Sequence, residues 1–391
     1  MTLLNRRQMI CGSGAIAAWA VLGARRGYGA QPRAVVKETA VISDQPQHYH
    51  GWPTVARCRS GRLLLVCSGG REGHVCPFGR VELMQSDDDG HTWTWPRVVL
   101  DSAIDDRDSG VVETAKGTLL VTTFTSLAYE SGLAGAERAK PGQPGVWPPE
   151  RLKHWQAVHN RLTAAQRQAD QGEWMIRSTD GGLTWSARYP SLVNSPHGPV
   201  QLSDGRLLYA GKELWHGKHR IGVCQSLDDG QTWQWLAEIP SRPGDNHEEY
   251  HELHAVETAD GRIVVQVRNH NKTDAGETLQ CESSDGGKTW TAPRSMGIWG
   301  LPSHLLRLKD DRLLMTYGHR AAPLGNMARI SRDHGRTWSE PLIVSGDGTS
   351  WDLGYPSTVQ LADGSLLTVW YEHIKAAPRA VLRQARWAIE E

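Results

Sequence analysis

The chain has 391 residues, and its 43 lysines and arginines balance its 43 aspartates and glutamates to a formal net charge of +0. A balanced chain lacks the basic patch that nucleic-acid binding requires, so we expect no nucleic-acid partner. After the first thirty residues no apolar stretch approaches membrane-spanning length, so we expect no membrane anchor in the mature protein.

The first thirty residues differ from the rest of the chain. An arginine pair, Arg6-Arg7, precedes a weakly apolar run from Cys11 to Ala24. This pattern is typical of a twin-arginine export signal, and an ordinary signal or a disordered start is the alternative. We therefore expect residues 1–30 to be removed and residues 31–391 to be periplasmic or secreted. Removal takes away four arginines and no acidic residue, so the formal charge falls to about −4.

After a lone strand predicted at residues 34–42, a hairpin pattern recurs six times. Each copy has an alternating apolar stretch, a two-residue turn and a second apolar stretch. Asp-Gly, the turn in three copies, is a strong β-hairpin signal between such stretches. The turns are Ser60-Gly61, Lys116-Gly117, Asp204-Gly205, Asp260-Gly261, Asp310-Asp311 and Asp363-Gly364.

An octad follows five of these hairpins and keeps Ser first, Asp third, Gly fifth and Thr-Trp last. Gly tolerates positive φ, the Asp side chain accepts turn N–H bonds, and Trp buries a large ring where the next strand begins. We therefore expect structural turns whose tryptophans are mostly buried. The octads span residues 86–93, 178–185, 226–233, 283–290 and 331–338.

The repeats predict the fold class. A pattern repeated at long intervals indicates stacked copies of one unit. Two hairpins give four antiparallel strands, so six such sheets in series predict an all-β, six-bladed β-propeller. The sixth blade lacks an octad, and we expect strand 34–42 to pair with strand 381–389 and close the ring. Residues 31–391 then form one domain, which we expect to be a monomer.

One insertion, between residues 126 and 172, interrupts the second blade. Its first part contains four prolines and is predicted to be a loop. Its second part keeps apolar residues on one helical face, from Leu152 through Trp155 to Ala169. We expect this helix to pack on the ring as a cover, and a lid over the site is the alternative.

Five cysteines remain after the predicted signal, at positions 58, 67, 76, 224 and 281. They have no regular spacing and no Cys-x-x-Cys pair of the kind that binds zinc. We expect them to be buried as small apolar residues rather than joined in disulfides.

The segments just before each inner strand are rich in titratable groups. In a propeller these strand ends meet at the central axis on one face, so we expect their polar groups to share one cavity. The segments are 50–53 (His-Gly-Trp-Pro), 105–108 (Asp-Asp-Arg-Asp), 195–199 (Ser-Pro-His-Gly-Pro), 250–254 (Tyr-His-Glu-Leu-His), 301–304 (Leu-Pro-Ser-His) and 352–356 (Asp-Leu-Gly-Tyr-Pro).

The octads resemble the Asp-box repeats of the sialidase (neuraminidase) superfamily, and they extend over nearly the whole mature chain. This resemblance implies the same six-bladed fold. Glu252, with Arg268 sixteen residues later, resembles the catalytic Glu and an arginine of the family's substrate-carboxylate clamp. Tyr355, eight residues before Asp363, resembles the catalytic Tyr. Arg320 falls near the place where a further clamp arginine is expected.

The chain also departs from the family pattern. Gly51-Trp52-Pro53 stands where the family has Arg-Ile-Pro, so one clamp arginine is missing. The loop at 71–76, which should carry the acid/base Asp, contains none. The predicted substitutes for that acid are Asp106, Asp108, Glu72 and His74. Further predicted substrate contacts are Arg71, Arg107 and Trp52.

The chemistry of a sialic acid explains a Tyr nucleophile. The sugar carries a carboxylate on its reacting carbon, which repels an anionic nucleophile, whereas a Tyr hydroxyl deprotonated by a neighbouring Glu attacks with less charge conflict. We therefore expect an exported exo-glycoside hydrolase that releases a terminal, acidic sugar from a glycan and needs no cofactor.

Four histidines lead to the alternatives. They come from four different blades and are expected to line the same pocket as substrate contacts; they are His50, His197, His254 and His304. Neutral imidazoles that converge on an axis also suit a metal or acid–base chemistry. A polysaccharide lyase with a His or Tyr base is therefore the main alternative, and a non-catalytic glycan-binding propeller is the third.

Overall fold

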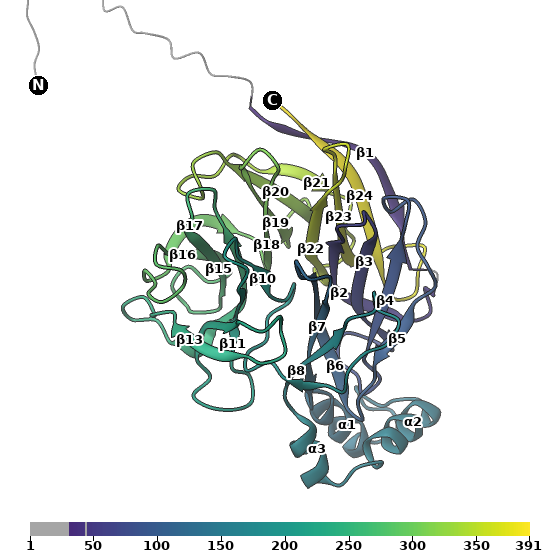
Figure 1. The fold of residues 1–391 in the computed structure, drawn as a ribbon. Coiled ribbons are helices and arrows are strands. Elements are labelled where there is room, and N and C mark those ends of the chain that lie inside the picture. Colours follow the sequence, from purple (N-terminus) through teal and green to yellow (C-terminus); the bar gives the residue numbers. More distant parts are fainter. Residues whose placement is uncertain (1–30, 44) are drawn as a thin grey trace, which may run out of the picture.

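The computed structural model describes residues 31–43 and 45–391, so the predicted export signal lies outside the described residues. The described chain forms six four-stranded antiparallel sheets that follow one another around a ring (Figure 1). First strands of neighbouring sheets pack together, for example β2 (Tyr49–Arg57) against β6 (Asp105–Glu113) and β22 (Leu353–Gln360). This is the predicted six-bladed propeller, and its first strands lie around the axis.

Each blade uses consecutive strands, except the last. Blades 1 to 3 comprise β2, β3 (Leu63–Arg71), β4 (Arg80–Ser86) and β5 (Arg97–Leu100); β6, β7 (Leu119–Ser126), β8 (Glu173–Ser178) and β9 (Tyr189–Pro190); and β10 (Val200–Gln201), β11 (Leu207–Lys212), β12 (Ile221–Ser226) and β13 (Gln234–Glu238). Blades 4 to 6 comprise β14 (Tyr250–Glu257), β15 (Ile263–Asn269), β16 (Glu277–Ser283) and β17 (Arg294–Trp299); β18 (Ser303–Arg307), β19 (Leu313–His319), β20 (Gly325–Ser331) and β21 (Leu342–Ser345); and β22, β23 (Leu366–His373), β24 (Ala380–Glu390) and β1 (Arg33–Val41).

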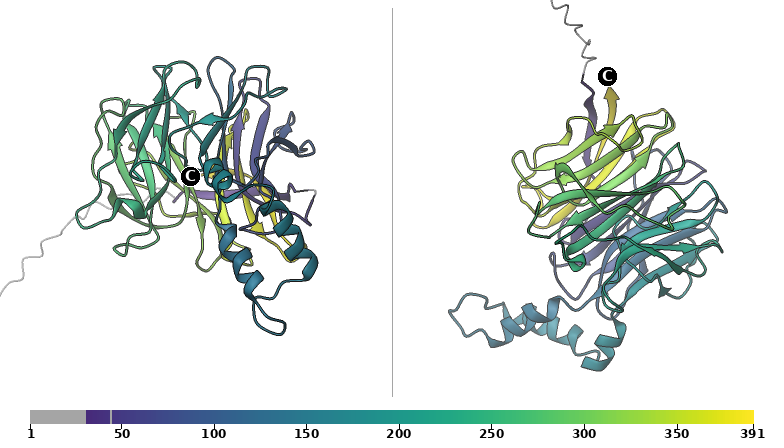
Figure 2. Two further views of the ribbon diagram at one scale, coloured as in Figure 1. Left: turned by 90° about the horizontal axis from the view of Figure 1, so that it is seen from below. Right: turned by 90° about the vertical axis from the view of Figure 1, so that its left-hand side faces the viewer.

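The N-terminal strand closes the ring as predicted. β1 pairs antiparallel with β24, from Arg33 opposite Glu390 to Val41 opposite Arg383. Figure 2 shows the two strands side by side at the edge of the molecule. The last blade thus takes its outer strand from the beginning of the described chain and its other three from the end.

The apolar core lies between blades. Six clusters of buried side chains each join two neighbouring blades, such as Leu65 with Val369 and Leu208 with Val265. A sheet has two faces, and in a ring each face is covered by a neighbour. Burying one Leu or Val contributes about 1.5–3 kcal/mol, so every blade depends on both of its neighbours. The five cysteines of the described chain are buried and free, as predicted.

Each octad is a closed, hydrogen-bonded turn between the two outermost strands of a blade. In the first octad the Ser86 hydroxyl accepts a bond from Gly90 N (2.8 Å) and donates to Asp88 (2.7 Å). Asp88 accepts from the backbone N and the hydroxyl of Thr92 (2.9 and 2.6 Å). The φ of 88° at Gly90 suits glycine alone. The Ser, Asp and Gly partners recur in the other octads.

The octad tryptophans are half-buried, which corrects the prediction that they are mostly buried. Each packs one part of its ring against a cluster between two blades, as Trp93 and Trp290 illustrate. The octads connect the two outermost strands of a blade. At that position no further strand covers the second face of the indole. The tryptophans therefore close the rim of the core rather than fill its centre.

The insertion contains three helices, which corrects the prediction of a loop followed by one helix. They are α1 (Tyr129–Arg138), α2 (Pro149–His159) and α3 (Ala164–Asp170). α1 forms before the prolines despite two glycines in its ten residues, because Tyr129, Leu133 and Ala136 are buried on one face of it. Only the segment between α1 and α2 is a loop. The second part is divided because Thr163 caps a new helix, its hydroxyl accepting from Gln166 N.

These helices project from the ring beside blades 1 and 2 (Figure 2). They pack on connecting loops rather than across the axis. Tyr129, Leu133 and Trp155 form a cluster with Cys76 and Ile104, which follow β3 and β5. Across the described residues, no helix is long and apolar enough to cross a membrane.

Candidate active site

Five of the six blades place a non-glycine residue with positive φ where the chain enters the first strand. In four of them the register of the ladder shifts at the same point. A bulge of this kind re-aims one side chain, and left-handed backbone at non-glycine residues is typical of functional sites. The residues are Trp52 (φ 53°), Asp108 (46°), His197 (75°), Glu252 (42°) and Tyr355 (52°).

Tyr355, Glu252 and Arg268 form one hydrogen-bonded trio, as the sequence predicted. The Tyr355 hydroxyl donates to Oε1 of Glu252, and Arg268 Nη1 donates to Oε2 of the same carboxylate. Arg268 Nη1 also lies 3.1 Å from the Tyr355 hydroxyl. Glu252 reaches the trio through the bulge in β14, and Arg268 lies on β15 opposite His251, the residue before Glu252.

The pKa values of Glu252 and Tyr355 shift in opposite directions. Burial acts to raise the pKa of Glu252, but the Arg268 charge and the bonds from Tyr355 and Arg268 keep that pKa below its usual value. Burial and the neighbouring Glu252 charge raise the pKa of Tyr355 well above 10.0. Arg268 acts to lower the pKa of both groups, but for Tyr355 burial and the Glu252 charge outweigh it. The resting pair is therefore a neutral phenol beside a carboxylate.

Asp108 interacts electrostatically with the trio. Burial raises the pKa of Asp108 to about 7, and the Glu252 charge acts in the same direction, against Arg107 and Arg268. Within the described residues Asp108 Oδ1 has no hydrogen-bond partner. Near neutral pH Asp108 thus keeps its proton in much of the population, and it can donate a hydrogen bond.

Two predicted clamp or contact arginines lie partly exposed near these groups. Arg320 donates from Nε and Nη2 to the Leu353 carbonyl (3.2 and 3.0 Å), and its charge lowers the pKa of Glu252. The Arg107 guanidinium lies 4.6 Å from the centre of the Trp52 ring. Together with Arg268 they bring cations from three blades to the site.

Arg71 and Trp52, predicted to contact substrate, are instead buried structural residues. Arg71 has no exposed side-chain surface and forms a two-point ion pair with Asp105 (2.5 and 2.9 Å). Trp52 is only 1% exposed and lies between the guanidinium groups of Arg71 and Arg107. A side chain with no surface cannot contact a ligand, so both predictions are corrected.

Two predicted acids are also engaged elsewhere. The fully buried Asp106 accepts a bond from Ser102 N (2.7 Å), and burial raises the pKa of Asp106 to about 8. Glu72 accepts from Trp155 Nε1 (2.8 Å) and Arg151 Nε (3.2 Å) of α2. A regular strand would point Asp106 and Asp108 to the same face, two positions apart. The register shift between Arg107 and Gly110 and the positive φ of Asp108 interrupt β6 there, and Asp108 is the one whose pKa responds to Glu252 and Arg268.

Three of the four predicted histidines gather, and one does not. The rings of His197, His254 and His304 lie 4.6 to 5.3 Å apart between centroids. Burial lowers the pKa of His254 to about 3, and the pKa values of the other two also fall well below 6.5, so the cluster is neutral. His50 lies apart, with Nε2 at 3.4 Å from Oε2 of Glu82. The prediction that all four histidines line one pocket is therefore corrected to a buried cluster of three.

Sequence reasoning named His74 but missed its partner. His74 Nδ1 lies 2.9 Å from Oδ1 of Asp352, which also accepts bonds from Tyr49 and Tyr371. The signal was present in the segment 352–356, where a carboxylate stands three residues before Tyr355. The contact between Asp352 and His74, which lies in a loop of blade 1, can be predicted only from the closure of the propeller ring.

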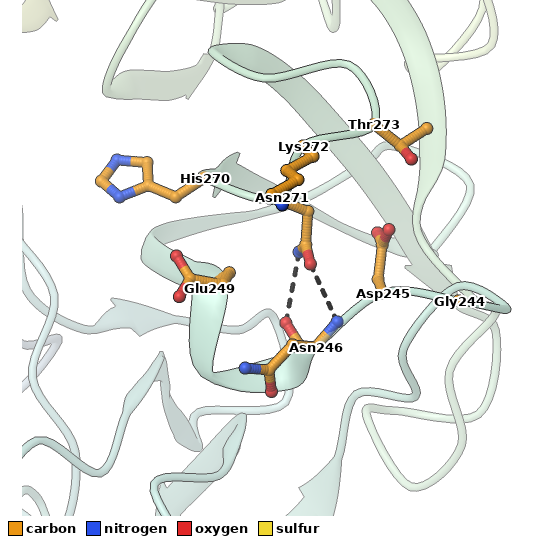
Figure 3. A pocket seen from close by; sticks show the side chains of 8 residues that line it. All are labelled: Gly244, Asp245, Asn246, Glu249, His270, Asn271, Lys272 and Thr273. Atoms are coloured by element: carbon orange, nitrogen blue, oxygen red, sulfur yellow. Dashed lines mark hydrogen bonds between the residues drawn. The ribbon is translucent and has the colours of Figure 1, made fainter.

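A pocket of about 420 Å³ lies between the segments 244–249 and 270–273 of blade 4 (Figure 3). Its polar lining includes Asn271, which bonds to Asn246 in both directions (2.8 and 3.2 Å). His270, which also lines it, accepts a bond from Arg268 Nε (2.7 Å). His270 therefore links the lining of this pocket to Arg268 of the trio.

Within the described residues, one group of side chains brings potential metal-ligand atoms close together. The group whose ligand atoms approach within 4.8 Å of one another is Glu249, His251 and His270, and none of the four predicted histidines belongs to it. Arg268 donates to a ring nitrogen of His270 and places a positive charge beside it. Both effects oppose a bound cation, so this arrangement does not favour a metal centre.

The fold and the chain's repeats define a sialidase-like propeller of the BNR repeat class. Residues 151–368, more than half of the chain, match the BNR repeat-like domain family. The chain belongs to this family, in agreement with its relatives and its structural neighbours.

Curated relatives match only parts of this chain. A sialidase of Bacteroides fragilis (strain YCH46) is 25% identical over 225 residues, which is 51% of this chain and 39% of that protein. A xyloglucanase of Paenibacillus sp is 30% identical over 165 residues, which is 40% of this chain and 15% of that protein. A sialidase of Micromonospora viridifaciens is 23% identical over 208 residues, 44% and 31% of the two chains. The chain spans well under half the length of each.

Solved structures share the fold. A Dyadobacter fermentans DSM 18053 protein of unknown function superimposes with a TM-score of 0.71 at 24% identity, covering 91% of this chain and 99% of that chain. A Streptococcus pneumoniae sialidase superimposes with a TM-score of 0.62 at 14% identity, covering 91% and 70%.

Proposed function

We propose that this protein is an exo-acting glycoside hydrolase of sialidase type that releases a terminal, acidic sugar from a glycan. The observation that carries the proposal is the trio: the buried Tyr355 phenol donates to Glu252, and Arg268 contacts both groups. The sialidase-like family supports a glycan-related function in general, and the trio supports this particular chemistry.

Tyr355 supplies the nucleophile in this mechanism. Its proton passes to Glu252 along the existing hydrogen bond while its oxygen bonds to the anomeric carbon. A phenol that is neutral at rest does not repel a carboxylate on the sugar. Arg268 stabilises the negative charge as it moves from Glu252 to the phenol oxygen, since it contacts both.

The acidic group of the sugar would be held by guanidinium groups. Arg107, Arg268 and Arg320 come from blades 2, 4 and 5, and paired N–H donors bind a carboxylate strongly. Arg320 currently donates both bonds to one carbonyl oxygen, which a charged carboxylate would outcompete. Asp108, with its raised pKa, would add a hydrogen-bond donor for a sugar hydroxyl.

The test is a panel of glycans with acidic or neutral terminal sugars, incubated with the purified protein and read by mass spectrometry. We expect release of the acidic sugar with water added across the bond. A product that is unsaturated by loss of water would indicate a lyase, and no product from any glycan would indicate a binding protein.

Tyr355→Phe is the first variant to compare. We expect it to abolish turnover, because no nucleophile remains, and to leave the melting temperature nearly unchanged. Tyr129→Phe is the matched control, because it removes another buried hydroxyl, which contacts His159 in the insertion. Full activity in the Tyr355→Phe variant would disprove the role of Tyr355 as nucleophile.

A further inference from the structure

The loop between β3 and β4 presents one imidazole to solvent. His74 Nδ1 bonds to Asp352 Oδ1 (2.9 Å), and its side chain is 40% exposed. Within the described residues Nε2 of His74 has no hydrogen-bond partner. This is the arrangement in which a carboxylate orients an imidazole and leaves its second nitrogen free for proton transfer.

Asp352 is held as a charged acceptor. It accepts bonds from Tyr49 (3.1 Å to each oxygen) and Tyr371 (2.9 Å), and it contacts His373 (3.2 Å). Burial opposes ionisation, but the His74 bond and charge, followed by the tyrosine bonds, lower the pKa of Asp352 to about 2. A carboxylate fixed by so many donors has one orientation available, and so does the imidazole bound to it.

The loop is fixed from its other side by the insertion. Glu72, two residues before His74, accepts bonds from Trp155 (2.8 Å) and Arg151 (3.2 Å) of α2. The His74 ring lies edge-on to Trp52 at 5.0 Å, and Trp52 in turn lies edge-on to Tyr355 at 6.4 Å between centroids. His74 and the Tyr355 phenol are thus both neighbours of one buried indole.

Exposure distinguishes His74 from Asp108. An exo-acting enzyme encloses the terminal sugar, so the departing remainder of the glycan lies toward solvent. The group that protonates the leaving oxygen must therefore be accessible from that side. His74 is 40% exposed at its side chain, whereas Asp108 is 6% exposed and turned toward Glu252.

We propose that His74, oriented by Asp352, is the general acid and base on the leaving-group side of this site; this inference rests on the function proposed above. In the first step the bond between the anomeric carbon and the leaving oxygen breaks as the Tyr355 oxygen bonds to that carbon. The phenol proton goes to Glu252, and the leaving oxygen takes the Nε2 proton of the His74 imidazolium. In the second step the bond between the Tyr355 oxygen and the carbon breaks as a water oxygen bonds to that carbon. The water gives a proton to His74 Nε2, and the released Tyr355 oxygen recovers its proton from Glu252.

The experiment compares two leaving groups on the acidic sugar that the glycan panel releases. An alkyl glycoside needs protonation to leave, whereas a 4-nitrophenyl glycoside departs as a stable phenolate. For His74→Gln we expect kcat/KM to fall about 10²-fold or more on the alkyl glycoside, the usual contribution of a general acid. On the nitrophenyl glycoside we expect a far smaller loss. Asp352→Asn, which affects a positioning residue, should show the same dependence on the leaving group.

His373→Gln is the matched control, because His373 contacts the same carboxylate but lies against Tyr49 instead of Trp52. Its ratio between the two substrates should equal that of the wild type. Equal losses on both substrates for His74→Gln, or no loss, would overturn the assignment. So would a leaving-group dependence in Asp108→Asn that His74→Gln lacks. A wild-type protein that hydrolyses neither glycoside would overturn the proposed hydrolase function itself, and this inference with it.

Discussion

Neighbouring groups decide the charge of each buried carboxyl near the axis. Glu252 contacts Arg268 and has a lowered pKa, whereas Asp106 meets only Ser102 and has a pKa of about 8. Both side chains are strongly desolvated, so burial alone does not distinguish them. The two carboxyl groups differ in their partners, because only Glu252 of the two contacts a guanidinium group.

The stability of the protein should therefore depend on Asp106 and pH. Because the folded pKa is raised from 3.8 to about 8, the folded state binds this proton more tightly than the unfolded chain. The associated stability is complete below about pH 4 and is lost as the pH rises toward about 8, by at most about 1.4 kcal/mol per pH unit. We expect Asp106→Asn, which does not titrate, to gain stability relative to the wild type between pH 5 and pH 8.

Urea unfolding at both pH values measures this difference. Asn keeps an acceptor for Ser102 N, so the substitution removes the proton without removing the bond. An offset between variant and wild type that is the same at pH 5 and pH 8 would show that Asp106 carries no extra proton in the folded state.

Single residues were predicted unevenly from the sequence. Tyr355, Glu252 and Arg268 were predicted because their sequence contexts resemble those of the catalytic Tyr, the catalytic Glu and a clamp arginine of the sialidase superfamily. The pairing of Arg71 with Asp105 and of His74 with Asp352 was not found. These pairs join different blades, and their contact depends on the angle between sheets, which the sequence pattern of one blade does not contain.

At the scale of elements, the octad should act as a local clamp on the outer edge of its blade. Asp228 accepts a bond from Ser226 (2.8 Å) and two from Thr232 (2.9 and 2.6 Å). We expect Asp228→Ala to lower the free energy of unfolding by about 1–3 kcal/mol, because turn donors lose their acceptor. Leu227→Ala in the same turn should change it by less than about 0.5 kcal/mol, since Leu227 is 66% exposed. Chemical denaturation compares the two, and equal effects would contradict the clamp.

The insertion illustrates why element boundaries were missed. Its apolar period indicated a helix, but the break before α3 depends on one capping hydroxyl, Thr163, and α1 has a weak apolar face of three buried residues. Local signals of this size are easily hidden in a single sequence. Where the helices pack depends on the loops of blades 1 and 2 and was not encoded in the insertion itself.

We expect the insertion to restrain the His74 loop. Trp155→Phe removes the indole N–H that bonds to Glu72 but keeps most of the buried ring surface. Amide hydrogen exchange within residues 73–79 should become faster, with little change in melting temperature. Trp147→Phe is the control, because its ring packs on Trp155 at 4.6 Å in the same cluster. Exchange that accelerates equally in both variants would point to loss of packing rather than to loss of the Glu72 bond.

At the scale of the whole molecule, the number of blades followed directly from counting repeats, and the ring then determined which segments meet. Each cluster between blades takes side chains from two sheets, so no blade has a complete core of its own. Closure of the ring pairs β1, from the beginning of the described chain, with β24, from its end. It also brings Asp352 of blade 6 to His74 of blade 1.

Removal of residues 31–41 should reveal how much the closing strand contributes. Most β1 side chains are exposed or half-buried, so its contribution comes mainly from the ladder with β24 rather than from apolar burial. Each backbone hydrogen bond contributes about 0.5–1.5 kcal/mol net, so the loss of this ladder should cost several times that amount. It also leaves β24 as an unpaired edge, which favours association of chains. We therefore expect a lower urea midpoint and concentration-dependent aggregation for the truncated protein.

Arg33→Ala, which removes only the exposed ion pair with Glu390, should shift the free energy of unfolding by less than about 1 kcal/mol. If truncation and the single substitution have the same small effect, β1 is an accessory strand and the ring is closed by β22 to β24 alone.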